Sequence, residues 1–87
     1  MAGQGSAAKR HRQSERRRLR NRAVRSEVRS SIRKFLDAVD AKKKDDASSQ
    51  LSSVTQLIDS ATGKGVYHKN TAARTKSRLT RKLNAMQ

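Results

Sequence analysis

The chain has 87 residues, of which 22 are Lys or Arg and 7 are Asp or Glu, so its formal net charge is +15. It has no Cys, Trp or Pro, and only 32% of its residues are hydrophobic. This composition excludes a disulfide framework, a thiolate metal site and a thiol nucleophile, and it leaves little apolar material to wall an enzyme pocket. No apolar run approaches the roughly 18 residues that span a bilayer. We therefore expect one small domain with a polyanionic partner.

The positive charge is concentrated at both ends of the chain. Residues 1–30 carry ten basic and two acidic side chains, residues 31–62 carry five of each, and residues 63–87 carry seven basic and no acidic side chains. Repulsion among so many like charges destabilises a compact state, and a bound polyanion relieves that repulsion.

A long first helix is predicted over about 6–44, because this stretch contains neither Pro nor Gly. Ser6 is the expected N-cap. At about 100° per residue, one apolar stripe runs along the second half, comprising Val24, Val28, Ile32, Phe35 and Val39, with Leu36 at its edge. Before Val24 the stripe stops, and Leu19 points away from it. The second half is therefore expected to pack in a core, and the Arg-rich first half to lie against RNA or DNA.

Two shorter helices are predicted to follow. Asp45 and Asp46 suit the start of a helix over 46–61, because acidic side chains are favoured at the positive end of the helix dipole. Its apolar positions are Leu51, Val54, Leu57, Ile58 and Ala61. Gly63 is the expected left-handed residue that ends it. The last helix is predicted over 69–86, with Ala72, Leu79, Leu83 and Met86 as its stripe. The predicted fold class is all-α: a three-helix antiparallel bundle whose long, basic N-terminal helix extends beyond the core.

A ridge of arginines lies beside the apolar stripe of the first helix. Its members, Arg18, Arg22, Arg25, Arg29 and Arg33, are spaced by four, three, four and four residues. Glu15 and Glu27 are the acidic residues of this half, so pairing within the helix leaves most of the ridge unpaired. Arginine can grip phosphate oxygens through two parallel hydrogen bonds. The ridge therefore predicts contact with nucleic acid.

A second basic cluster opens the last helix, at His68-Lys69-Asn70-Thr71. Free amides at a helix N-terminus bind anions, so this sequence indicates either a phosphate site, an ordinary N-cap by Asn70, or both. Gly63-Lys64-Gly65 does not match a phosphate-binding P-loop, because Ile58 and Gly65 stand where Gly and Ser or Thr are required. Lys64 is still a candidate phosphate contact. Tyr67 either stacks on a base or closes the edge of the bundle.

Other sites are not expected. His11 and His68 are the only histidines and are 57 residues apart, so neither a metal nor another cofactor is predicted. Stepping by seven from Val28 gives Phe35 and then Lys42, which ends a zipper pattern. One Phe and one Tyr are too few for a base-stacking platform. Binding is therefore expected to read phosphate, sugar and shape.

The motifs at both ends resemble one known family. The first runs from Ser6-Ala7-Ala8-Lys9-Arg10-His11-Arg12-Gln13-Ser14-Glu15 to Arg17-Arg18-Leu19-Arg20-Asn21-Arg22-Ala23-Val24-Arg25-Ser26, and the second is Gly65-Val66-Tyr67-His68-Lys69-Asn70-Thr71-Ala72-Ala73-Arg74-Thr75-Lys76-Ser77-Arg78-Leu79. Almost the entire chain is similar to the family of the bacterial small-subunit ribosomal protein numbered twenty. The resemblance implies a three-helix bundle that binds 16S ribosomal RNA directly and has no catalytic activity.

The residue pattern and the resemblance together predict an RNA-binding set on the first helix, the turn and the third helix. The set is Lys9, Arg10, Arg12, Arg16, Arg17, Arg18, Arg20, Asn21, Arg22, Arg25, Arg29, Lys64, His68, Lys69, Asn70, Arg74, Lys76 and Arg78. The predicted function is that of a structural, non-enzymatic, primary binder of 16S ribosomal RNA, cytoplasmic within the ribosome and monomeric outside it. It needs no cofactor, membrane or small-molecule substrate. The alternative is a DNA-compacting nucleoid protein that binds without sequence preference.

Overall fold

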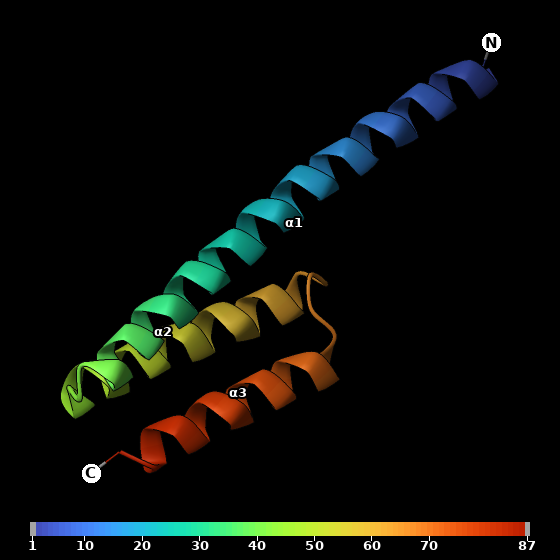
Figure 1. Cartoon of the computed structure of the whole chain (residues 1–87). Coiled ribbons are helices and arrows are strands. Elements are labelled where there is room, and N and C mark those ends of the chain that lie inside the picture. Colours follow the sequence, from blue (N-terminus) through green and yellow to red (C-terminus); the bar gives the residue numbers. More distant parts are fainter. Residues whose placement is uncertain (1, 87) are drawn as a thin grey trace.

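The computed structural model describes residues 2–86, with side chains from residue 7 onward. Within this range the chain forms α1 (Ala2–Asp40), α2 (Lys44–Gly63) and α3 (Lys69–Asn84), joined by short turns. Each helix runs antiparallel to the one before it, and the turns place α2 beside both of its neighbours (Figure 1). The predicted all-α bundle with a long first helix is confirmed.

The apolar stripes meet in one core. Phe35, Val54 and Ile58 are the largest fully buried side chains. Every apolar position predicted from helical spacing is either buried in this core or packed against it. Two buried apolar side chains, Ala47 and Val66, were not predicted, and neither was the burial of the polar residue Ser31. Burial of a large aliphatic or aromatic side chain contributes roughly 1.5–3 kcal/mol, so this small core is the main stabilising element of the bundle.

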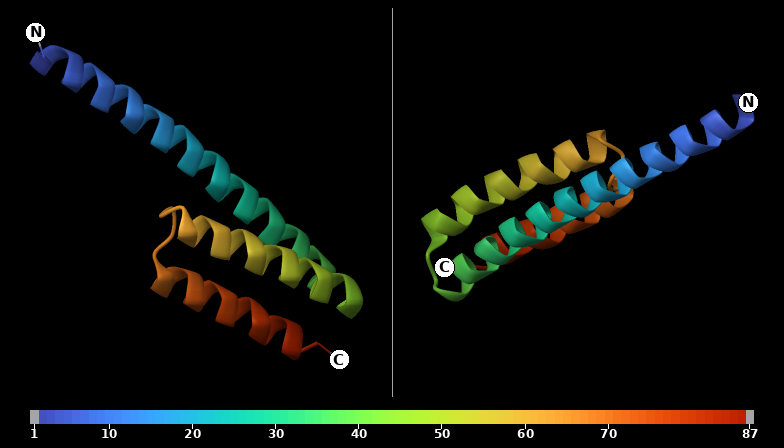
Figure 2. Two further views of the ribbon diagram at one scale, coloured as in Figure 1. Left: turned by 180° about the vertical axis from the view of Figure 1, so that it is seen from behind. Right: turned by 90° about the horizontal axis from the view of Figure 1, so that it is seen from above.

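The first half of α1 projects beyond the core (Figure 2). The Cα atoms extend 66 Å along the longest axis and have a radius of gyration of 17.5 Å, whereas a compact chain of this length has about 12 Å. Val24 is the first α1 residue packed against the core. Leu19, further out, is 62% exposed. We call residues 7–23 the arm. No apolar face of the arm packs against the rest of the protein.

Both ends of α1 differ from the prediction. The helix begins at Ala2, so Ser6 lies inside it and is not the N-cap. It ends at Asp40 rather than 44, because Lys42 adopts a left-handed conformation with φ of 59°. The Lys42 and Lys43 amides donate to the carbonyls of Val39 and Ala38, both at 3.0 Å. These are the two hydrogen bonds of a Schellman motif, and they allow α2 to begin already at Lys44.

The end of α2 repeats this motif with a different glycine from the one predicted. The left-handed residue is Gly65, with φ of 79°, whereas Gly63 is still helical. The Gly65 amide donates to the Thr62 carbonyl at 3.0 Å, and the Val66 amide donates to the Ala61 carbonyl at 2.9 Å. Val66 and Ala61 are both buried, as expected for the apolar pair that accompanies a Schellman motif. Burial of Val66 therefore sets the position of the turn.

The two glycines of this turn should respond in opposite ways to alanine. Gly65→Ala forces a Cβ into the left-handed region and should lower the free energy of unfolding by about 1–2 kcal/mol. Gly63 is helical, and a Cβ at this position would have no neighbouring atom within 4 Å. Gly63→Ala should therefore raise the free energy of unfolding by about 0.4–1 kcal/mol. Urea unfolding of both variants measures the difference. Equal midpoints for the two variants would contradict this assignment of the turn.

Candidate nucleic-acid interface

The arm carries cations on every side. At about 100° per residue, Arg10, Arg17 and Asn21 continue the line that the core stripe follows further along α1. The remaining arm cations are distributed around the rest of the helix. Apart from half-buried Asn21, the predicted α1 residues are all exposed: Lys9, Arg10, Arg12, Arg16, Arg17, Arg18, Arg20, Arg22, Arg25 and Arg29. The face that packs in the bundle therefore becomes a charged face in the arm.

Little of this charge is neutralised within the protein. Among the described residues, the arm's one ion pair joins Arg18 Nη1 to Glu15 Oε1 at 3.6 Å, and the two side chains are 70% and 45% exposed. Exposed pairs of this kind contribute at most about 1 kcal/mol. The arm therefore presents a strong positive field to its surroundings.

A hydrogen bond links the base of the arm to the second basic cluster. Arg20 Nη2 donates to the carbonyl oxygen of Lys64 at 3.2 Å, and its contact with the Asn21 side-chain oxygen is 3.4 Å. Figure 1 shows the turn between α2 and α3 at the end of the bundle from which α1 projects. Lys64 and the start of α3 therefore lie at the base of the arm, although both are more than forty positions from Arg20 in the sequence.

His68 caps the first turn of α3. Its backbone is extended, and its Nδ1 accepts a hydrogen bond from the Asn70 amide at 3.1 Å. The prediction that Asn70 is the N-cap is therefore wrong, because the cap acceptor is supplied two residues earlier. Lys69 and Asn70 are exposed at this helix end and remain available to an anion.

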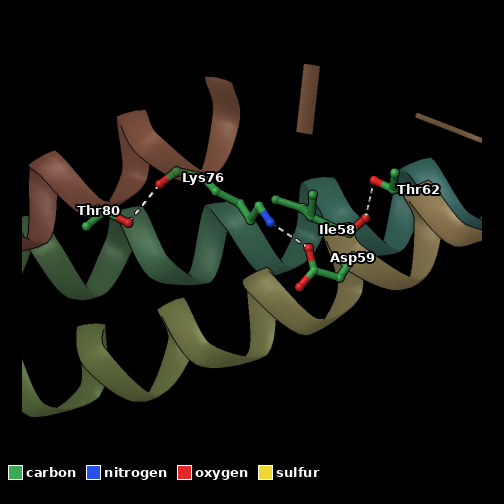
Figure 3. A network of polar contacts seen from close by, with 5 residues as sticks. All are labelled: Ile58, Asp59, Thr62, Lys76 and Thr80. Atoms are coloured by element: carbon green, nitrogen blue, oxygen red, sulfur yellow. Dashed lines mark hydrogen bonds and ion pairs between the residues drawn. The ribbon is translucent and has the colours of Figure 1, made fainter. Parts of the chain in front are cut away.

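Lys76 has a protein partner. Its Nζ lies 2.6 Å from Asp59 Oδ1, and its side chain is 34% exposed (Figure 3). In the same view, the Thr62 and Thr80 hydroxyls donate to the carbonyls of Ile58 and Lys76 within their own helices, both at 2.8 Å. Lys76 thus joins α3 to α2. It differs in this from the predicted residues Arg74 and Arg78, which are exposed and form no ion pair with any residue that the structure describes.

Tyr67 closes the edge of the bundle. It is half-buried and packs against the core. With Val28, Ile32 and Ile58 it lines a small cavity of about 70 Å³. Of the two interpretations of this side chain, the structure supports the packing role.

Over the residues that the structure describes, no helix is both long and apolar enough to cross a membrane. The same residues contain no cluster of three or more His, Cys, Asp or Glu side chains placed to hold a metal ion.

Comparison with known proteins agrees with this geometry. The sequence model of a family described as "Ribosomal protein S20" matches residues 2–84. The chain belongs to the ribosomal protein S20 family. The resemblance noted from the two terminal motifs is thereby confirmed.

Individual S20 relatives match over nearly their full lengths. The small ribosomal subunit protein bS20 of Syntrophus aciditrophicus is 51% identical over 85 residues, which cover 98% of this chain and 96% of the relative. Its namesake in Mycolicibacterium smegmatis is 49% identical over 86 residues, covering 99% of this chain and all of the relative. That of Clostridium beijerinckii is 45% identical over 86 residues, covering 99% of both.

The cap at His68 can be tested through stability. His68→Ala removes the acceptor for the Asn70 amide and should cost about 0.5–2 kcal/mol, whereas His68→Asn supplies another acceptor and should restore most of that loss. Thermal unfolding followed by circular dichroism compares the two variants. If alanine and asparagine give the same melting temperature, the imidazole is not acting as a cap.

Proposed function

We propose that this chain is a structural component of the small ribosomal subunit and that it binds 16S ribosomal RNA directly. The observation that supports this most is the arm: one continuous helix with exposed cations on all sides and no apolar face, in a member of the S20 family. A protein in this role acts in the cytoplasm as part of the ribosome, is a monomer when free, and contributes packing and charge rather than catalysis.

The mechanism follows from electrostatics. Each Lys or Arg that contacts a phosphate releases condensed counterions, which favours binding. Arginine adds bidentate hydrogen bonds to phosphate oxygens. Because cations surround the arm, they can reduce the repulsion between RNA segments that approach it from more than one side.

The proposed contact residues are those predicted from the sequence, with two qualifications from the structure. Arg20 and Lys76 each hold another part of the protein, so they help to position the interface as well as adding charge to it. The others in the set are exposed or, for Asn21, half-buried.

The DNA-compacting alternative makes a different prediction in a competition experiment. Labelled 16S ribosomal RNA is bound at fixed salt and challenged with increasing amounts of unlabelled duplex DNA, and the two nucleic acids are compared by their phosphate concentrations. Specific binding should resist displacement until DNA is in excess by about a thousandfold or more. If DNA competes equally, the protein is a general nucleic-acid binder and the ribosomal proposal fails.

A single arm arginine should contribute one phosphate contact. Arg22→Ala should weaken binding modestly and reduce the slope of log affinity against log salt by about one unit. The matched control is Leu19→Ala, which removes an exposed but uncharged side chain of the same arm. Binding isotherms at several salt concentrations measure both slopes. An unchanged slope for Arg22→Ala would show that this residue does not contact a phosphate.

A further inference from the structure

The third helix has the smallest share in the core of the bundle. Its close backbone contacts are with α2, and its approach to α1 is much looser. Figure 1 shows α2 lying between the other two helices. Among the buried apolar side chains of the described residues, α3 supplies only Ala72 and Leu79. The largest fully buried ones, Phe35, Val54 and Ile58, belong to α1 and α2. The contact between α1 and α2 is therefore the larger part of the core.

The packing of α3 against α1 also contains a gap. The cavity of about 70 Å³ has residues of all three helices in its lining, including Val28 and Ile32 of α1, Ile58 of α2, and Ala72 and Thr75 of α3. Side chains that face a void lose the dispersion contacts that a filled site would supply. This side of the bundle therefore holds α3 less firmly than a filled interface would.

Repulsion among like charges opposes the folded position of α3. The helix carries six cations and no acidic residue. Arg74 and Arg78 are four residues apart, and like charges at this spacing destabilise a helix. Only Arg81 and Lys82 lie in the last turn, where the helix dipole favours cations. With 16 residues, α3 is also close to the length below which isolated helices are marginal in water. We therefore expect α3 to unfold whenever it leaves the bundle.

One ion pair acts against this repulsion. Among the described residues, the contact between Lys76 Nζ and Asp59 Oδ1, at 2.6 Å, is the only ion pair that α3 forms (Figure 3). Asp59 is the only acidic residue of α2 beyond its first turn. The pair joins the middle of α3 to the second half of α2 and so holds the two helices together across their interface.

We propose that α3 opens as a unit in the free protein, leaving a folded hairpin of α1 and α2, and that the ion pair between Lys76 and Asp59 favours the closed position. Opening relieves the repulsion among the cations of α3 and exposes few buried side chains. Closing is favoured by the apolar stripe of α3 and by the ion pair. Opening requires less free energy than global unfolding, because the contacts between α1 and α2 persist in the open form.

This equilibrium makes the order of α3 sensitive to bound anions. A ligand that binds the cations of α3 more tightly in the closed helix than in the open form shifts the population toward closure. The proposal goes beyond the ribosomal function, because the opening is a property of the protein without RNA.

Amide hydrogen exchange of the free protein tests the opening. The amides of α3 should share one free energy of opening, with protection factors about tenfold or more below those of the most protected amides of α1 and α2. The opening should depend on urea with a smaller slope than global unfolding, because it exposes less surface. Equal protection and equal urea dependence in all three helices would show that the bundle opens only globally, and would overturn the proposal. Exchange in α3 that varies from amide to amide without urea dependence is fraying, and it overturns the proposal too.

Two methionine variants test the ion pair. Lys76→Met removes the charge and keeps most of the length of the side chain, so it should lower the protection of α3 about two- to fivefold, as expected for a partly exposed pair. The matched control is Arg74→Met, which removes an exposed cation that has no ion-pair partner among the described residues. This variant should leave the protection of α3 unchanged or raise it.

A second substitution checks the same contact from α2. Asp59→Asn removes the partner of Lys76 and should lower the protection of α3 by a similar factor. Unchanged protection in Lys76→Met and Asp59→Asn, or an equal fall in Arg74→Met, would overturn the role of the ion pair. Circular dichroism establishes that each variant folds before its exchange is compared.

The outcomes are separate from those of the ribosomal proposal. Each exchange measurement uses the free protein and needs no RNA. Failure of the ribosomal function appears instead in the competition experiment, as equal displacement by DNA. A protein that fails there and still shows the opening of α3 supports this proposal alone.

Discussion

The fold depends on the packing of one short apolar stripe of α1 against α2 and α3. The stripe begins at Val24, and Phe35 at its centre is fully buried together with Val54 and Ile58 of α2. A chain of this size buries only about 60% of its unfolded surface, and a net charge of +15 opposes compaction. The core must therefore offset the repulsion of the bundle and also anchor an arm that has no packing of its own.

The charge of the molecule is distributed unevenly around this core. The arm and α3 carry most of the excess positive charge, while α2 separates them with a neutral to acidic sequence. The ion pair between Lys76 and Asp59 joins α3 to α2, and the hydrogen bond from Arg20 to the Lys64 carbonyl joins the turn to α1. Two cations, Lys76 and Arg20, thus hold together the helices on which the other cations are exposed.

The helices and the core could be predicted from the sequence because apolar spacing of about 3.6 residues is a local signal. The helix ends were predicted less well. Lys42 takes a left-handed conformation that composition does not indicate, and Gly65 was identifiable only by recognising that Val66 must be buried after it. His68 was missed because imidazole is not among the preferred N-cap side chains. The ion pair of Lys76 depends on how two helices pack, which no local pattern records.

The continuity of α1 has a geometric consequence. The arm and the core-packing half are one helix without a turn or a glycine between residues 6 and 40, so the core fixes the rotation of every arm side chain about the helix axis. One residue inserted near Val24 would turn the whole arm by about 100° and advance it by about 1.5 Å. Seven inserted residues would bring it back to within about 20° of its original rotation. The bundle thus acts as a rotational reference that sets which arginine faces which direction, well beyond the last residue that the core touches.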